Sequence, residues 1–229
     1  MSATWVRSVF QLCAVAFAAA FPLVASGAAR AEAMSFRLQP ILDDGRCGDH
    51  CPQVIAAEGQ IVNSTPQDFL EFLRDNIEDR NLRTVVFINS QGGFVVASME
   101  LGQMFRRIGA ATVVARVGAS SGRSHFLQGQ CLSACVYAFM GGKKRVAPRG
   151  SALGIHRMFA NQVREHFFAE SEVIRRYDNG AMATTLMNYS ARMGVSRDII
   201  RAAEHISSAT LHIVTAQEMA RWNLAHREF

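Results

Sequence analysis

Apolar and polar residues along the chain follow two different periods, which predicts strands and helices in turn. Short runs rich in β-branched residues are typical of buried strands, and they occur at 54–62, 82–89 and 111–118, then in "KKRVAP" and "ALGIHRM". Apolar residues spaced three and four apart predict helices, and they occur at 64–76, 94–109 and 161–193, then in "SRDIIRAAEHI" and "TAQEMARWN". The segments 34–52 and 119–130 are predicted to be irregular. Because strands and helices alternate, the pattern favours an α/β fold with a parallel sheet and right-handed crossovers.

The first 31 residues are predicted to be a secretory signal peptide that is removed. The apolar run "VFQLCAVAFAAAFPLVASGAA" follows Arg7, and "ARA" at 29–31 offers a small-x-small cleavage site. The alternative is an uncleaved membrane anchor, since the run is nearly long enough to span a bilayer. Pro22 and a second cleavage pattern, "AEA", favour removal. We therefore expect a periplasmic protein with three parts: a leader at 1–31, an N-terminal arm at 32–53 and one folded domain at 54–229.

The charge balance argues against a nucleic-acid partner. Loss of Arg7 and Arg30 with the leader takes the 24 basic residues to 22, against 19 acidic ones, a net charge of +3. No basic cluster is longer than "KKR" at 143–145. A nucleic-acid binder normally shows a basic face interleaved with aromatic residues, and the sequence has no such pattern.

Four cysteines remain in the predicted mature chain, as two C-x3-C pairs: Cys47 with Cys51, and Cys131 with Cys135. Neither pair has the C-x2-C spacing of common zinc sites, so disulfides are favoured over a metal site, and free thiols are the alternative. Cysteines four apart on one helix have nearly parallel Cβ vectors, which suits a bridge poorly. We therefore expect Cys47 or Cys51 to be bonded to Cys131 or Cys135. No metal and no cofactor is expected.

A serine and a histidine 23 residues apart are candidates for acyl-transfer chemistry. Ser133, near the start of a predicted helix, could act as a nucleophile, and His156, in a short strand, could accept its proton. The amide of Ala134 and the turn at Gly92 and Gly93 could stabilise an oxyanion. Each feature also has an ordinary explanation as a helix cap, a turn or a core histidine.

The order of these motifs resembles the proteolytic subunit of the Clp protease. "VVFINSQGGFVVASMELGQMFRRIG" is similar to that family's strand, Gly-Gly turn and helix, and "CLSACVYAFMGGKKRVAPRGSALGIH" to its nucleophile helix and catalytic histidine. "TAQEMARWNLA" matches its C-terminal segment, so the similarity covers about residues 54–225. The resemblance implies a ClpP/crotonase-like spiral of ββα units with parallel sheets and a C-terminal helical segment. It also implies Ser133 as the nucleophile, His156 as the base, and Gly93 and Ala134 as the oxyanion-hole donors.

The chain departs from that family in two places. The family's aspartate lies four residues before the position of Thr215, and this residue is Leu211 here. An acidic residue could orient His156 instead, and the candidates are Asp198, Glu204 and Asp178. The remaining options are a Ser–His dyad or, as a minor variant, a Ser–Lys dyad with Lys143 or Lys144. The second departure is the segment 119–130, which is an insertion relative to the family.

The leading hypothesis is an exported serine hydrolase, a peptidase that cleaves peptides or unfolded segments through an acyl-enzyme on Ser133. The alternative is an inactive scaffold or binding protein of the cell envelope, which Leu211 favours. A crotonase-like thioester enzyme is disfavoured because coenzyme A is not expected outside the cytoplasm, and no ATP-dependent unfoldase partner is expected where ATP is lacking. A helix over 161–193 would project and expose apolar residues, which predicts a homo-oligomer. Two shorter helices broken at "DNG" (178–180) are the alternative there.

Overall fold

The computed structural model describes residues 32–40, 51–76, 78, 82–120, 123–166, 169–177 and 179–228. They belong to the compact unit Ala31–Phe229. The predicted leader, Cys47 and Asp178 lie outside the described residues. Within the described residues, no helix has both the length and the apolar character needed to cross a membrane.

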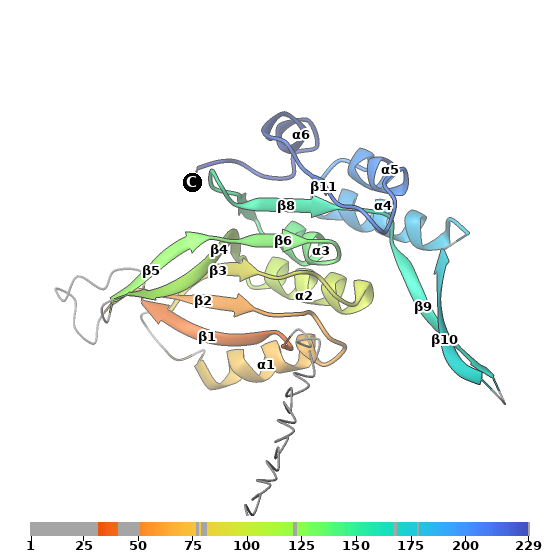
Figure 1. Cartoon of the computed structure of the whole chain (residues 1–229). Coiled ribbons are helices and arrows are strands. Elements are labelled where there is room, and N and C mark those ends of the chain that lie inside the picture. The colour runs from red at the N-terminus through yellow and green to blue at the C-terminus, as the bar shows by residue number, and fades with distance from the viewer. Residues whose placement is uncertain are drawn as a thin grey trace, which may run out of the picture. The chain divides into compact units, whose positions relative to one another are not determined.

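The larger sheet has six strands among the described residues. Its order is β1-β2-β3-β4-β5, with β7 also paired to β4 (Figure 1). The pairs β2–β3, β3–β4 and β4–β7 are parallel, whereas β1 and β5 are antiparallel to their neighbours. The bounds are β1 Ser35–Pro40, β2 Gln53–Glu58, β3 Leu82–Asn89, β4 Ala111–Ser120, β5 Arg123–Gln128 and β7 Lys144–Val146. β3 has the bounds predicted from its β-branched run, and the predicted parallel core of the sheet is confirmed.

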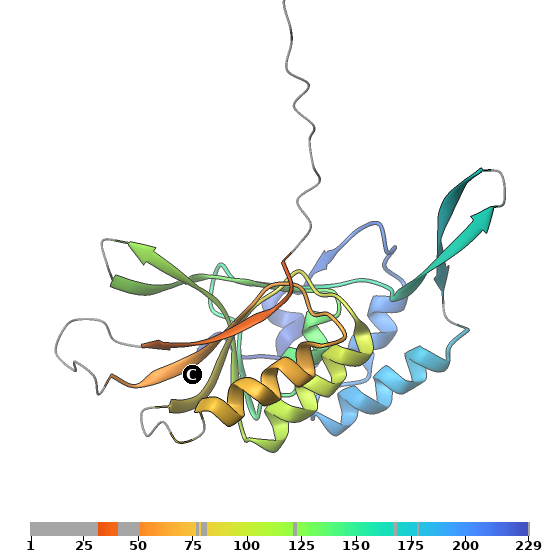
Figure 2. The same cartoon turned by 90° about the horizontal axis from the view of Figure 1, so that it is seen from below.

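Two amphipathic helices lie side by side next to this sheet (Figure 2). They are α1 (Thr65–Asn76) and α2 (Val95–Arg107), both close to their predicted bounds. Phe69 of α1 and Phe105 of α2 are fully buried and meet edge to face, with ring centroids 5.1 Å apart. Burying two such rings removes a large apolar area from water, which anchors both helices to the core.

A smaller sheet carries the second half of the fold. In it β6 (Gln130–Leu132) and β8 (Ala152–Ile155) run parallel, and β11 (His212–Ile213) pairs antiparallel with β8. A bridge between Ser90 and Cys131 joins the end of β3 to β6. The helices of this half are α3 (Cys135–Met140), α4 (Ala181–Arg192), α5 (Asp198–Glu204) and α6 (Ala216–Arg221).

The long helix predicted over 161–193 is wrong. Residues Phe159–His166 and Ala169–Tyr177 form the antiparallel strands β9 and β10, a hairpin that projects from the rest of the unit (Figure 1). Val163 pairs with Val173 across the hairpin, and the guanidinium of Arg175 lies 4.8 Å from the ring centroid of Phe159. Such cross-strand contacts outweigh a weak helical spacing. Only the end of the stretch is helical, as α4, so the alternative of two shorter helices is wrong in its first half, although α4 does begin just after the proposed break.

Two segments predicted to be irregular contain strands. β1 lies within 34–52, and its Phe36 ring packs 5.0 Å from that of Phe69. The segment 119–130 holds the end of β4, all of β5 and the start of β6, and the Phe126 ring packs 4.3 Å from that of Phe87. In both cases one aromatic side chain finds a partner far away in the sequence, and that contact cannot be read from local turn residues.

Candidate active site

Ser133 sits in a strained turn between a strand and a helix. β6 ends at Leu132, α3 begins at Cys135, and Ser133 has φ 55, one of two positive values among non-glycine residues of the described chain. A left-handed conformation costs an L-residue roughly 1–2 kcal/mol. In a regular strand, alternation would send neighbouring side chains to opposite faces. The turn breaks that alternation and re-aims Ser133, and strain of this kind is common at functional sites.

The cysteine bridge predicted between the N-terminal arm and this region is wrong. Cys131 and Cys135 are bonded to each other, and Cys51 is disulfide-bonded elsewhere. The prediction assumed that both cysteines of the pair lie on one helix. Cys131 lies instead on β6, and the turn at Ser133 brings the two Cα atoms to 5.2 Å, within the usual disulfide range. These bonds also exclude a metal site built from all four cysteines.

The Gly92–Gly93 turn packs directly against Ser133. Both glycines have positive φ, 103° and 144°. A Cβ on Gly92 would lie 2.9 Å from the Cβ of Ser133 and 3.1 Å from the amide nitrogen of Ala134. A Cβ on Gly93 would overlap the backbone of Ile61. Glycine is therefore required at both positions, because each has a positive φ and each approaches neighbouring atoms too closely for a side chain.

Two amides at this turn are left without acceptors. Ile61 donates to the carbonyl of Gly92 at 2.8 Å and accepts from the N–H of Phe94 at 2.9 Å, so the N–H of Gly93 points away from Ile61. Across the part of the chain that the structure describes, neither Gly93 N–H nor Ala134 N–H has a hydrogen-bond acceptor. Free backbone donors beside a serine can bind an oxyanion.

His156 lies at the end of the neighbouring strand. The parallel register pairs Leu132 with Gly154, so His156 comes one residue beyond the position opposite Ser133. Its side chain is 9% exposed, and its Nδ1 lies 2.8 Å from the carbonyl oxygen of Arg157. A carbonyl only accepts, so Nδ1 carries a hydrogen, and in the neutral imidazole Nε2 is the nitrogen with the lone pair. The described residues include no hydrogen bond between the Ser133 hydroxyl and His156, although such bonds often tighten only with substrate.

Leu211 occupies the place beside His156 where the resemblance implied an acid. β11 pairs His212 with Ile155, and continuing this antiparallel register sets Leu211 opposite His156. The Leu211 side chain covers Gly154, because a Cβ there would lie 2.7 Å from Leu211 Cδ2. An aliphatic side chain therefore fills the position, and it offers His156 no hydrogen bond.

Neither described carboxylate proposed as a substitute interacts with His156. Asp198 is fully exposed and bonds Arg201 and Ser196, and the hydrogen bond from Arg201 is the main reason its pKa lies below the usual range. Glu204 forms an ion pair with Arg157, Oε2 to Nε 3.1 Å. Glu204 is thus linked to His156 only through Arg157, whose side chain pairs with Glu204 and whose carbonyl accepts from the imidazole.

One histidine–carboxylate pair was not predicted from the sequence. His212 Nε2 lies 2.9 Å from Glu218, which also accepts from the backbone N–H of Thr215 at 2.8 Å. Burial raises the pKa of Glu218, but the hydrogen bonds from Thr215 and His212 outweigh it, and the net pKa is lowered. Thr215 and Glu218 form a capping box at the start of α6, so this pair has a structural role.

The lysines of the Ser–Lys variant lie at the opposite end of the larger sheet from Ser133. Lys144 pairs with Ala111 at the start of β4, which in turn pairs with Val85 in β3. Ser133 lies beyond the opposite end of β3, so the separation along the strands is on the order of 15 Å. A proton could not pass directly from Ser133 to Lys143 or Lys144 over that distance.

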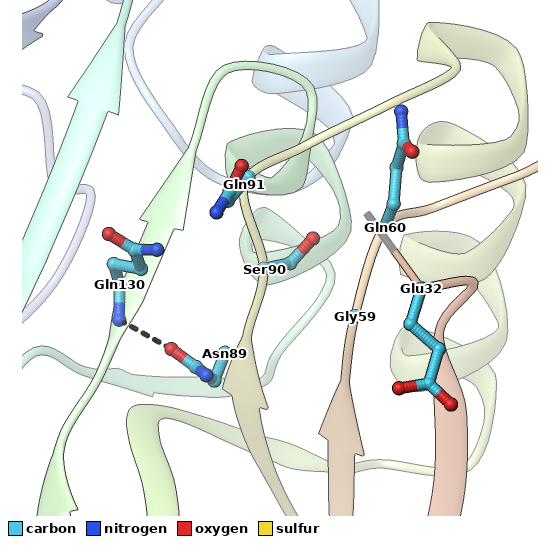
Figure 3. A pocket seen from close by; sticks show the side chains of 7 residues that line it. All are labelled: Glu32, Gly59, Gln60, Asn89, Ser90, Gln91 and Gln130. Carbon is cyan, nitrogen blue, oxygen red and sulfur yellow. Dashed lines mark hydrogen bonds between the residues drawn. The ribbon is translucent and has the colours of Figure 1, made fainter. Parts of the chain in front are cut away.

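A polar pocket of about 180 Å³ opens next to the Gly92–Gly93 turn. Figure 3 shows Gln130 and Asn89 on one side, Gln60 and Glu32 on the other, and Ser90 and Gln91 between them. The Asn89 side-chain oxygen accepts from Gln130 N at 3.0 Å, and Ser90 Oγ accepts from Gly92 N at 3.1 Å. Ser90 thereby connects the pocket wall to the turn. The polar run "NSQGG" after a buried strand was the sequence signal for it.

The side chains at the site are amides, hydroxyls, the carboxylate of Glu32 and one imidazole. Within the described residues, no group of three or more histidine, cysteine or acidic side chains could hold a metal ion. The groups gathered here can donate or accept hydrogen bonds, and Ser133 is the one that could attack an electrophile.

Comparison with known proteins identifies the fold. No family model and no curated protein matches the sequence. Among solved structures, a serine-to-alanine mutant of the membrane-bound stomatin-specific protease 1510-N superposes with a TM-score of 0.51 and 15% identity, over 76% of this chain and 78% of that one. A lysine-to-alanine mutant of the same protease, in complex with a substrate peptide, gives a TM-score of 0.50 and 16% identity, over 76% and 74%. With the observed topology, this likeness confirms the α/β, ClpP/crotonase-like fold that the order of the motifs predicted.

Proposed function

We propose that the protein is a serine peptidase that cleaves peptide bonds through an acyl-enzyme on Ser133. The observation that carries the proposal is the Ser133 turn, a strained strand-to-helix junction packed against Gly92 and flanked by two free amides. The similarity to protease structures, one with a substrate peptide, supports the same reaction class. No cofactor takes part in the proposed reaction.

The proposed mechanism uses this chain's own groups throughout. Ser133 Oγ attacks the peptide carbonyl carbon while His156 Nε2 takes the hydroxyl proton. The amides of Gly93 and Ala134 hold the oxyanion, and His156 then gives its proton to the leaving amine. Water attacks the resulting ester with His156 again as the base, which releases the acid and restores Ser133.

We infer that a backbone carbonyl replaces the missing acid. The Arg157 carbonyl accepts the Nδ1 hydrogen of His156, which sets the tautomer that an aspartate would otherwise set. Two further contacts hold Arg157: its N–H donates to Ile206 O at 3.0 Å, and its guanidinium lies 4.7 Å from the Tyr177 ring. The dipole of a carbonyl stabilises an imidazolium cation less strongly than the negative charge of a carboxylate would. The expected enzyme is therefore a Ser–His dyad with slower turnover than a full triad.

Removing either candidate acid should have little effect on hydrolysis. Asp198→Asn should match the wild type, because Asp198 is exposed and bonds other residues. Glu204→Gln should stay within about fivefold, since a partly exposed ion pair contributes about 0–1 kcal/mol. Initial rates on an unfolded protein substrate would measure both. A hundredfold loss in either variant would identify that residue as the third catalytic member and contradict the dyad.

The second candidate is a scaffold or binding protein without catalytic activity. The observation in its favour is Leu211, which lies in register with His156 where an acid is missing. Labelling with a fluorophosphonate, which reacts with activated serines, separates the two functions. If the protein is a peptidase, the probe should label the wild type but not Ser133→Ala. If it is a scaffold, the probe should label neither protein.

The proposed substrates are peptides or unfolded segments in the periplasm. The predicted signal peptide supports export, and disulfide-bonded cysteines fit an oxidising compartment. An ATP-dependent unfoldase is not expected there. The pocket beside the turn is lined by amide side chains and Glu32, so a polar substrate side chain would suit it.

The β9–β10 hairpin supports the proposal of a homo-oligomer. An isolated two-stranded hairpin is marginally stable, and this one exposes Val173 (61%) and Tyr177 (43%). Val173→Glu should lower the mass measured by light scattering to that of a monomer, about 22 kDa for the cleaved chain. Leu70→Glu, a matched exposed position on α1, should not change the mass. A wild-type mass of one subunit at every concentration would contradict assembly.

A further inference from the structure

The residues that flank Ser133 are covalently joined. Cys131 belongs to β6, Cys135 is the first residue of α3, and both are completely buried. The bond closes a ring around Leu132, Ser133 and Ala134, which contains the proposed nucleophile and one proposed oxyanion donor. We propose that this disulfide positions the Ser133 turn for catalysis, so that activity depends on oxidation of the pair. The inference rests on the proposed function of Ser133.

The disulfide adds a covalent restraint to the hydrogen bonds and the Gly92 contact that hold the turn. Ser133 donates from its N–H to Gly154 O at 2.8 Å, and its carbonyl accepts from Val136 N at 3.1 Å. The positive φ of Ser133 is unfavourable for a residue with a side chain, so an unrestrained turn would tend to relax towards a right-handed conformation. Such a change would rotate the Ala134 amide and the Ser133 side chain together. The ring limits that relaxation because the Cys131 and Cys135 side chains on either side of the turn are joined, which restricts the backbone angles between them.

The fold itself depends little on this bond. Every residue of α3 is buried. Thr112 Oγ1 donates to the Phe139 carbonyl at 2.9 Å, and the Tyr189 hydroxyl donates to the Tyr137 carbonyl at 2.7 Å. A ring of five residues also removes little chain entropy from the unfolded state compared with a long loop. Loss of the disulfide should therefore disturb the turn and leave α3 in place.

Oxidation of the pair would then control when the enzyme is active. Two thiols form the bond by giving two electrons and two protons to an exchanging disulfide, which is reduced to two thiols. A reducing cytoplasm keeps the thiols free. The newly made chain would carry a relaxed Ser133 turn there and would gain activity only in an oxidising compartment.

Paired cysteine variants test this role. Cys131→Ala/Cys135→Ala is expected to lower the second-order rate constant of fluorophosphonate labelling at least tenfold, and to lower kcat with little change in KM. Cys47→Ala/Cys51→Ala removes the other two cysteines of the predicted mature chain and should react at the wild-type rate. Near-UV circular dichroism should show that both variants are folded. A folded Cys131→Ala/Cys135→Ala protein with wild-type labelling would overturn the proposal.

Two further measurements keep the test decisive. If the double variant does not fold, wild-type protein can be treated with increasing dithiol and the thiols of the 131–135 peptide alkylated and counted by mass. Labelling should fall in step with reduction of that pair and return on reoxidation. A fully reduced pair with unchanged labelling would refute the inference.

Hydrogen exchange separates failure of this inference from failure of the proposed function. Wild-type protein that is not labelled at all would refute the catalytic role of Ser133 alone. The amides of Ser133, Ala134 and Val136 should still exchange faster in Cys131→Ala/Cys135→Ala than in Cys47→Ala/Cys51→Ala. Equal exchange in the two variants would show that the disulfide does not hold the turn.

Discussion

Replacing Ser133 with alanine is expected to reduce peptide hydrolysis by about 10⁴-fold or more, the scale seen when a serine nucleophile is removed. Without Oγ, no acyl-enzyme can form, and the two free amides have no attacking atom beside them. The fold should be unaffected, because alanine and serine both carry a Cβ and meet a similar cost at φ 55. The N–H bond to Gly154 is a backbone bond and remains.

Hydrolysis of an unfolded protein substrate would be measured together with the thermal unfolding midpoint. Ser64→Ala is a suitable control, since Ser64 is an exposed residue just before α1 whose hydroxyl donates to Asp68 in the first turn of that helix. The control should keep full activity. Ser133→Ala activity within a few-fold of wild type would remove Ser133 from the mechanism.

Replacing His156 with alanine is expected to lower the rate by about 10²-fold or more, the usual share of general base catalysis. Nδ1 of His156 is committed to the Arg157 carbonyl, so Nε2 is the nitrogen that can take the serine proton.

His205→Ala provides the matched control, because His205 is exposed at the end of α5. It should leave the rate unchanged. If His156→Ala loses less than tenfold while Ser133→Ala is inactive, another group must activate the serine.

Much of the site could be predicted from the sequence because its parts are local. The Gly92–Gly93 turn follows a buried strand directly, and the structure confirms that it lies against Ser133. The serine, the following amide and the histidine were selected by residue type, spacing and motif order. Their catalytic roles stay predictions, although the structure gathers them at the ends of adjacent strands.

The parts that could not be predicted depend on partners distant along the chain. The bridge between Cys131 and Cys135 depended on a turn conformation that places one cysteine on a strand and the other on a helix. The orienting contact of His156 is a backbone carbonyl, which residue type does not reveal. The ion-pair partners of Asp198 and Glu204, Arg201 and Arg157, could not be read from the sequence either.

The sequence by itself determined the elements whose burial follows from their own periodicity. The run Leu82–Asn89 is rich in apolar and β-branched residues, and its consecutive residues Val86, Phe87 and Ile88 are buried; the apolar stripe of Thr65–Asn76 allows a single inward face. Only the tertiary structure decided the β9–β10 hairpin, the strands β1 and β5, and the register that sets Leu211 opposite His156. The local spacing of apolar residues specifies which side chains must be buried. Strand pairing joins residues that are far apart along the chain, and no periodic pattern in the sequence indicates which of them pair.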